Sequence, residues 1–176
     1  RSMFRTVSSH ESSPDRIVSI LNESMAEINE LNMFVTLFVG VLDLETGLMH
    51  YCNAGHDAPL LVGMGVGELP VDSNIPVGFM PDWTFTVQEA VVCQGTTIFL
   101  FTDGLTEAEN ANHDQFQMDR INEVAERALA EHKQAPKDII AMMADAVHDF
   151  VGDAEQSDDL TMLAIQLLKG TPPPEC

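Results

Sequence analysis

Three aspartates stand where two apolar segments end or begin. Asp103 directly follows the apolar run 98–101, and Asp158 and Asp159 directly precede the run 160–167. If these runs are strands that pair antiparallel, the end of one lies beside the start of the other, and the carboxylates meet at one sheet edge. Such oxygens suit Mg²⁺ or Mn²⁺, and a pair of these ions lowers the pKa of a bridging water and holds a phosphate oxygen during in-line attack.

The spacing of these aspartates also has a simpler interpretation, which spacing alone favours. In it, Asp103-Gly104 is a turn, and Ser157-Asp158-Asp159 is an acidic cap or a surface loop. The pattern by itself therefore does not decide between a metal site and ordinary loop chemistry.

The elements that would position these residues can be read from apolar periodicity. Ser13 and Pro14 predict the start of an amphipathic helix whose apolar positions recur as far as Leu31. The run 34–42 predicts a strand buried on both faces, and 48–52 its hairpin partner. A short strand is expected at 60–62, a long loop at 63–79 and a half-buried strand at 83–87.

The second half of the chain mixes strands and helices. A core strand is expected at 96–101, helices at about 119–131 and 136–150, a last strand at about 160–167 and a tail at 171–176. Strand runs come first and two helices precede the last strand, so the predicted class is α+β with mainly antiparallel sheets.

Composition bounds the class of protein. The 176 residues, 45% of them hydrophobic, fit a single domain at 1–170, and the formal net charge of −20 disfavours binding to nucleic acid or to anionic lipid. Three widely spaced cysteines without a C-x-x-C fit neither a disulfide framework nor a zinc cluster and predict a cytoplasmic location. No apolar run approaches the length of a membrane span, and we expect no membrane contact from this segment.

Several motifs together resemble one family. The stretch FLFTDGLTEAENANHDQF at 99–116 is similar to the signature of the SpoIIE (sporulation stage II E) branch of the metal-dependent PPM protein phosphatases. The segment 48–62 with Asn53-Ala54-Gly55-His56, the segment Ile75-Pro76-Val77-Gly78, and Ser157-Asp158-Asp159-Leu160-Thr161 agree with that family in order and spacing.

The resemblance implies a two-sheet antiparallel β-sandwich flanked by helices, with two Mn²⁺ or Mg²⁺ ions at one end and no other cofactor. Asp103 and Asp158 would bind metal, and a metal-activated water would be the nucleophile. Asp159 stands where relatives often have Asn, so Asp159, like Gly104 and Asn110, would support the ligands rather than bind directly. Glu107 and Asn110 could orient Asp103, or could simply be surface residues.

One departure from the family matters for activity. Its G-D-x-S-G-x-G segment, which supplies further metal-binding aspartates, has no counterpart here. The resemblance therefore implies an N-terminal truncation that lacks strands of the domain, with weak metal binding and little turnover from this chain alone.

His56 has two interpretations. Its usual pKa would suit a general acid near neutrality, but within Asn-Ala-Gly-His-Asp either Asn53 or His56 more simply ties a hairpin turn. The preferred interpretation is the turn.

The resemblance also implies a function. It implies hydrolysis of phosphoserine or phosphothreonine on an anti-anti-sigma regulator of the STAS type, in a bacterial signalling protein that carries an upstream sensor or receiver module. The alternative is a non-catalytic phosphatase fold that binds a regulator in a partner-switching pathway.

Overall fold

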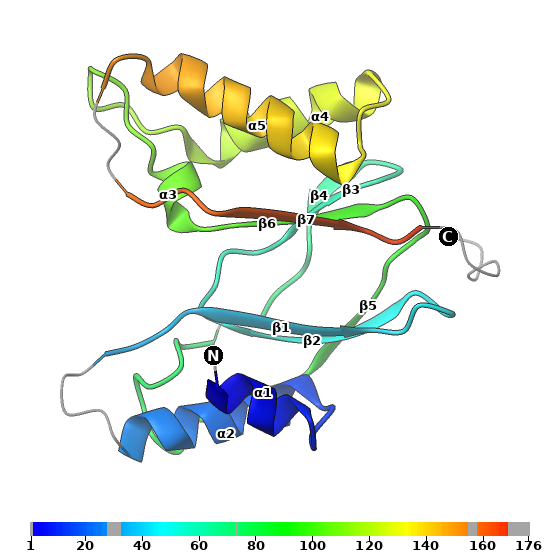
Figure 1. Cartoon of the computed structure of the whole chain (residues 1–176), viewed down its shortest axis with the longest axis vertical. Helices are drawn as coiled ribbons and strands as arrows, with labels where there is room; N and C mark the ends of the chain where they lie inside the picture. The colour runs from blue at the N-terminus through cyan, green and yellow to red at the C-terminus, as the bar shows by residue number, and fades with distance from the viewer. Residues whose placement is uncertain (1, 28–32, 73, 155–157, 169–176) are drawn as a thin grey trace. The chain divides into compact units, whose positions relative to one another are not determined.

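The computed structural model describes residues 2–27, 33–72, 74–154 and 158–168. The fold is α+β, with helices and two antiparallel sheets, as predicted (Figure 1). The described residues form two compact units: an N-terminal unit, made of 1–56 and 70–92, and a C-terminal unit, made of 57–69 and 93–176.

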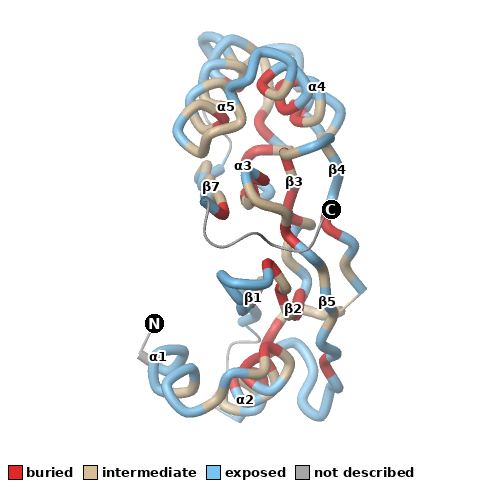
Figure 2. Tube along the Cα trace, turned by 90° about the vertical axis from the view of Figure 1, so that its right-hand side faces the viewer, coloured by how far each residue is buried: buried red, intermediate tan, exposed pale blue. Residues whose placement is uncertain are grey.

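The N-terminal unit is a small sheet covered by helices. It contains α1 (Ser2–Ser8), α2 (Pro14–Glu27), β1 (Leu37–Leu42), β2 (Leu48–Ala54) and β5 (Gln88–Val91), with the strands in the order β1-β2-β5. The apolar side of α2, with Ile17, Val18 and Leu21, packs against the inner face of β1 and β2. Burial of this stripe, shown in red in Figure 2, stabilises the unit.

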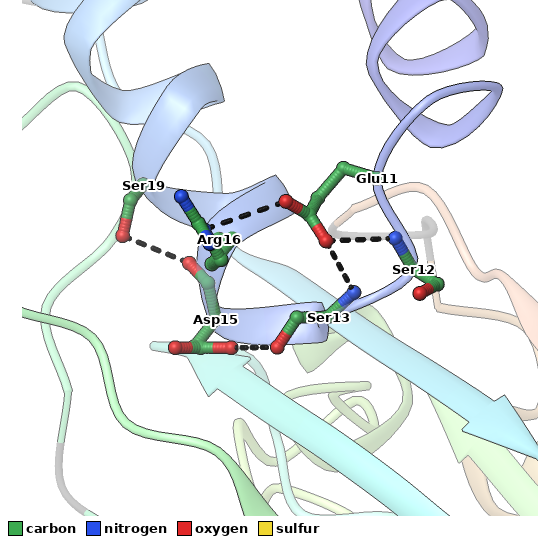
Figure 3. A network of polar contacts seen from close by, with 6 residues as sticks. All are labelled: Glu11, Ser12, Ser13, Asp15, Arg16 and Ser19. Atoms are coloured by element: carbon green, nitrogen blue, oxygen red, sulfur yellow. Dashed lines mark hydrogen bonds and ion pairs between the residues drawn. The ribbon is translucent and has the colours of Figure 1, made fainter.

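A polar network holds the turn between α1 and α2 (Figure 3). The Glu11 carboxylate accepts hydrogen bonds from the backbone N–H groups of Ser12 and Ser13 at 2.9 and 3.0 Å, and its other oxygen lies 3.4 Å from Nε of Arg16. The Ser13 N–H, aided by the Ser12 N–H and by Arg16, lowers the pKa of the Glu11 carboxyl against the opposing effects of burial and Asp15. The helix starts at Pro14 as predicted, whereas Ile28 and Leu31 of the expected helix lie outside the described residues.

Two strand predictions in this unit are wrong in detail. The run 34–42 is not buried on both faces, because Phe34, Val35 and Val41 are 56%, 46% and 39% exposed, and the strand β1 itself begins only at Leu37. The half-buried strand expected at 83–87 lies further along, at β5, where burial alternates at 88–91. Phe85 is buried without belonging to a strand, so its apolar character made the segment 83–87 imitate the alternating pattern of a strand.

The C-terminal unit combines a four-stranded sheet with a pair of long helices. It contains β3 (Leu60–Val62), β4 (Val66–Glu68), β6 (Thr97–Phe101), α3 (Asp103–Thr106), α4 (Gln117–Ala130), α5 (Pro136–Val151) and β7 (Met162–Gln166). The strand order is β4-β3-β6-β7, all antiparallel.

The helices α4 and α5 cover one face of this sheet (Figure 1). The core between them is apolar: Leu60, Phe99 and Phe101 come from the strands, and Ile121 and Met143 from the helices. The short strand β4 was missed because its glycine-rich surroundings read as loop, and α3 was missed because Asp103-Gly104 read as a turn.

The cysteines differ from each other in their surroundings. Cys52 is free and buried in β2. Cys93 is disulfide-bonded, a pairing that the sequence did not predict.

Candidate functional site

The pairing of β6 with β7 brings the acidic segments together. The ladder runs antiparallel from Thr97 opposite Gln166 to Phe101 opposite Met162. The end of β6 therefore lies beside the start of β7, as the sequence predicted, and α3 begins at Asp103 at this end of the sheet (Figure 1). Asp158 and Asp159 enter β7 from the same end.

Thr102 joins the two segments beyond the last strand pair. Its backbone N–H donates to the carbonyl oxygen of Thr161 at 3.1 Å, and its hydroxyl oxygen accepts from the backbone N–H of Thr161 at 3.2 Å. The same hydroxyl donates to the carbonyl oxygen of Asp159 at 3.3 Å. One side chain thus fixes the backbone before Asp103 against the backbone that carries Asp159.

Gly104 allows this close approach. A Cβ atom at this buried position would meet the carbonyl oxygen of Asp159 well inside van der Waals contact. Because the obstacle is backbone rather than the end of a flexible side chain, a larger residue would push the two segments apart. The glycine is required by packing, and its role in supporting a metal ligand stays a prediction.

The two candidate ligands, Asp103 and Asp158, are both exposed to solvent. Asp103 Oδ1 accepts from the N–H of Gly104 at 3.0 Å, and Asp158 Oδ1 accepts from the N–H of Asp159 at 2.7 Å. These local bonds limit the rotation of each carboxylate. The side chains of Asp103 and Asp158 would offer carboxylate oxygens as metal ligands, which suits Mg²⁺ and Mn²⁺. Within the described ranges, no group of three or more His, Cys, Asp or Glu could hold a metal ion.

Asn110 closes a loop of its own. Its Oδ1 accepts from the N–H groups of Asn112 and Asp114 at 2.9 and 3.0 Å, and its Nδ2 donates to the Asp114 carboxylate at 3.1 Å. Glu107 follows α3, and its N–H donates to the carbonyl oxygen of Asp103. Asn110 therefore orders the segment after α3, and Glu107 contacts the backbone of Asp103.

The side chain of Asn53 ties the turn at 53–56. Its Oδ1 accepts from the N–H of His56 at 2.9 Å, and its Nδ2 donates to the His56 carbonyl oxygen at 2.7 Å. The turn is not the link of a hairpin, because β2 and β3 belong to different sheets. The prediction that this motif forms a turn closed by a side chain of the motif is thus confirmed, whereas the prediction that the turn links the strands of a hairpin is wrong.

Sequence reasoning missed Thr102 and a pocket of about 190 Å³ beside it. The pocket is lined in part by Gly104 and Leu160, the neighbours of Asp103 and Asp159. The signal for Thr102 was its place between the last strand residue and the aspartate. No sequence signal pointed to the pocket, because α5 contributes to it through packing.

The fold is that of PP2C-type phosphatases. It matches the RsbU and RsbW domains of Rv1364c from Mycobacterium tuberculosis with a TM-score of 0.76 and 23% identity, over 97% of this chain and 46% of that one. It matches the SiaA-PP2C domain of Pseudomonas aeruginosa with a TM-score of 0.75 and 20% identity, over 93% and 65% of the two chains. The manganese-presoaked SpoIIE phosphatase domain of Bacillus subtilis matches with a TM-score of 0.60 and 14% identity, over 97% and 74%.

The family follows from the sequence. The profile of the family "Stage II sporulation protein E (SpoIIE)" matches residues 1–168, so the chain belongs to the SpoIIE family. Protein IcfG of Synechocystis is 29% identical over 150 residues, which are 84% of this chain and 23% of IcfG. The chain therefore spans less than a quarter of the length of this curated relative.

Proposed function

We propose that the chain is the part of a metal-dependent protein phosphatase that supplies Asp103 and Asp158 as ligands for Mn²⁺ or Mg²⁺. The observation that supports this most is the β6–β7 edge, which brings two acidic segments far apart in sequence to one place. Membership of the SpoIIE family supports phosphatase chemistry. The proposed reaction is hydrolysis of phosphoserine or phosphothreonine.

Each residue at this edge has a distinct task in the proposed site. Asp103 and Asp158 present carboxylate oxygens to the ions, and Asp159 contributes its backbone carbonyl to the bond with Thr102. Gly104 keeps the two segments close, and Asn110 orders the loop that follows. When bound, two such ions supply a water of lowered pKa and a positive clamp on the phosphate.

The proposed substrate is a phosphorylated STAS-type regulator, an anti-anti-sigma protein, in a partner-switching pathway. The support is the fold shared with RsbU- and SiaA-type domains. A sensor or receiver module in the whole protein would control the reaction, and the proposed location is the cytoplasm. Among the described residues, no helix is long and apolar enough to cross a membrane.

Mn²⁺-dependent release of phosphate from p-nitrophenyl phosphate tests the reaction class. The comparison includes this chain, its Asp103→Asn variant, an EDTA control, and the chain extended by its native upstream sequence. We expect little turnover from the chain alone and clear turnover from the extended chain, lost on Asp103→Asn and with EDTA. Substitution of the exposed Asp119 by Asn is the matched control and should leave turnover unchanged.

The alternative is a non-catalytic phosphatase fold that binds a regulator. It predicts that the extended chain stays silent in Mn²⁺ while it still binds a STAS-type protein. This outcome would replace the enzyme by an interaction module.

A further inference from the structure

A pocket of about 190 Å³ opens beside the proposed metal edge, inside the C-terminal unit. One wall is the C-terminal half of α5, with Ala144, Val147 and Val151. Gly104 and Leu160 also line the pocket, and each directly follows one of the site aspartates in sequence. A group that fills the pocket therefore touches the same two backbone segments that hold Asp103 and Asp159.

The size of the pocket limits what it can hold. Pockets for drug-sized ligands occupy roughly 300–1,000 Å³, so this one is too small for a molecule of that class. It has room for one amino-acid side chain. Aliphatic groups make most of its wall, and a water molecule there would find few polar partners. An apolar side chain is thus the occupant that this lining favours.

The charge around the pocket favours a partner segment of opposite charge. Glu109 and His148 are the polar side chains of the lining. Glu109 is the acidic group of the lining, and the chain as a whole carries a formal net charge of −20. A segment that lies across this surface would be favoured if it carries basic residues, because opposite charges steer association and fix register.

We propose that this pocket receives an apolar side chain of the phosphoprotein substrate, from a segment with basic residues near the phosphorylated serine or threonine. The inference rests on the proposed function and adds a determinant of substrate choice to it. The pocket acts through binding of a flanking residue, so a small substrate such as p-nitrophenyl phosphate does not use it.

The test fills the pocket from α5. Ala144→Leu places a larger side chain in it, and Leu is as suitable for a helix as Ala in most contexts. Ala141→Leu is the matched control, because Ala141 is exposed on the same helix and does not line the pocket. The probes are phosphoserine peptides with flanking lysines, in which a single leucine replaces alanine at each flanking position in turn.

The binding readout is independent of turnover. Methyl NMR signals of Val147, Val151 and Leu160 are followed as each peptide is added to the chain. We expect one leucine position to shift these signals and to bind about tenfold more tightly than the all-alanine peptide. Ala144→Leu should abolish this preference, and Ala141→Leu should keep it. Replacing the lysines by glutamates should weaken binding of the leucine peptide.

Three results would overturn the inference: no leucine position is preferred, the shifts occur elsewhere, or Ala144→Leu keeps the preference. The proposed function is tested separately by p-nitrophenyl phosphate with the extended chain. Normal turnover in that assay with no leucine preference would reject the pocket and keep the phosphatase. A leucine preference without any turnover would keep the pocket as a peptide site and reject the enzyme.

Discussion

Thr102 holds the two acidic segments together through both its backbone and its hydroxyl group. The hydroxyl accepts from the Thr161 N–H and donates to the Asp159 carbonyl oxygen, so a single oxygen atom connects β6 to the start of β7. Partners that orient metal ligands commonly change metal affinity when they are removed. Thr102 is therefore a positioning residue in the proposed site.

Thr102→Val removes the hydroxyl and nearly keeps the shape of the side chain. We expect the free energy of unfolding without metal to fall by about 1 kcal/mol, because two hydrogen bonds are lost at a partly exposed place. The affinity for Mn²⁺ should fall about tenfold. Urea unfolding and Mn²⁺ titration measure the two effects.

Thr102→Ser is the matched control, because it keeps the hydroxyl. It should retain Mn²⁺ affinity close to that of the unaltered chain. If Ser and Val behave alike, the hydroxyl has no positioning role and the threonine methyl group matters instead.

At the residue scale, the sequence predicted more of the site's placement than of its construction. The sequence predicted that Asp103 and Asp158 come to one sheet edge if two apolar runs pair antiparallel, and β6 and β7 do pair in this way. The support by Thr102 and the tight contact of Gly104 could not be predicted, because both depend on atoms that approach across the sheet edge. The chemistry of Asp103 and Asp158 stays a prediction.

At the element scale, α2 holds a loop in place in addition to packing against the sheet. Asn22 is buried on α2; its Nδ2 donates to the Met80 carbonyl oxygen at 3.0 Å, and its Oδ1 accepts from the Gly78 N–H at 2.8 Å. Gly78 has a φ of 87°, a conformation that favours glycine. The helix and the loop 77–80 therefore hold each other in place.

Asn22→Ala should lower the free energy of unfolding by about 1–3 kcal/mol, because it leaves two backbone groups without their partner. Ser19→Ala is the control on the same helix, where the hydroxyl bonds only to the Asp15 carbonyl oxygen one turn earlier. It should cost less than about 0.5 kcal/mol. Urea unfolding of both variants decides, and equal costs would contradict the role of Asn22.

Elements with regular periodicity were predictable, and so was the short strand β3, whereas β4 and α3 were not. The apolar stripes of α4 and α5 fixed both helices to within two residues at either end. The strand β4 has three residues, one of them Gly67, which is too few to show a period. The strand β5 was predicted too early because Trp83, Phe85 and Val87 imitate alternation. Tertiary contacts, which local pattern does not contain, determine these segments.

At the scale of the whole molecule, each unit has its own apolar core, and the N-terminal one contains an ionisable group. Burial, followed by the charge of Asp15, raises the pKa of the Cys52 thiol to about 11. In the unfolded chain the thiol titrates near its usual value of about 8.5. The folded state thus favours the neutral thiol, and this contribution to stability is present below the unfolded pKa and lost as pH rises through the folded pKa.

The free energy of unfolding should therefore fall between pH about 8.5 and about 11, by up to about 1.4 kcal/mol per pH unit from this group. Cys52→Ala removes the titration and should show a shallower fall over the same window. Urea unfolding at several pH values compares the two chains. Parallel pH profiles would show that Cys52 does not titrate differently in the folded state.

The central claim is that the β6–β7 edge binds a divalent cation through Asp103 and Asp158, and paramagnetic broadening by Mn²⁺ tests it most directly. Increasing Mn²⁺ is added to the isotope-labelled chain, and the amide NMR signals are followed residue by residue. The account predicts that Gly104 and Asp159 broaden first and that Asp103→Asn removes this priority. First broadening at other acidic positions, such as Asp149 and Asp153, or a pattern unchanged by Asp103→Asn, would contradict it.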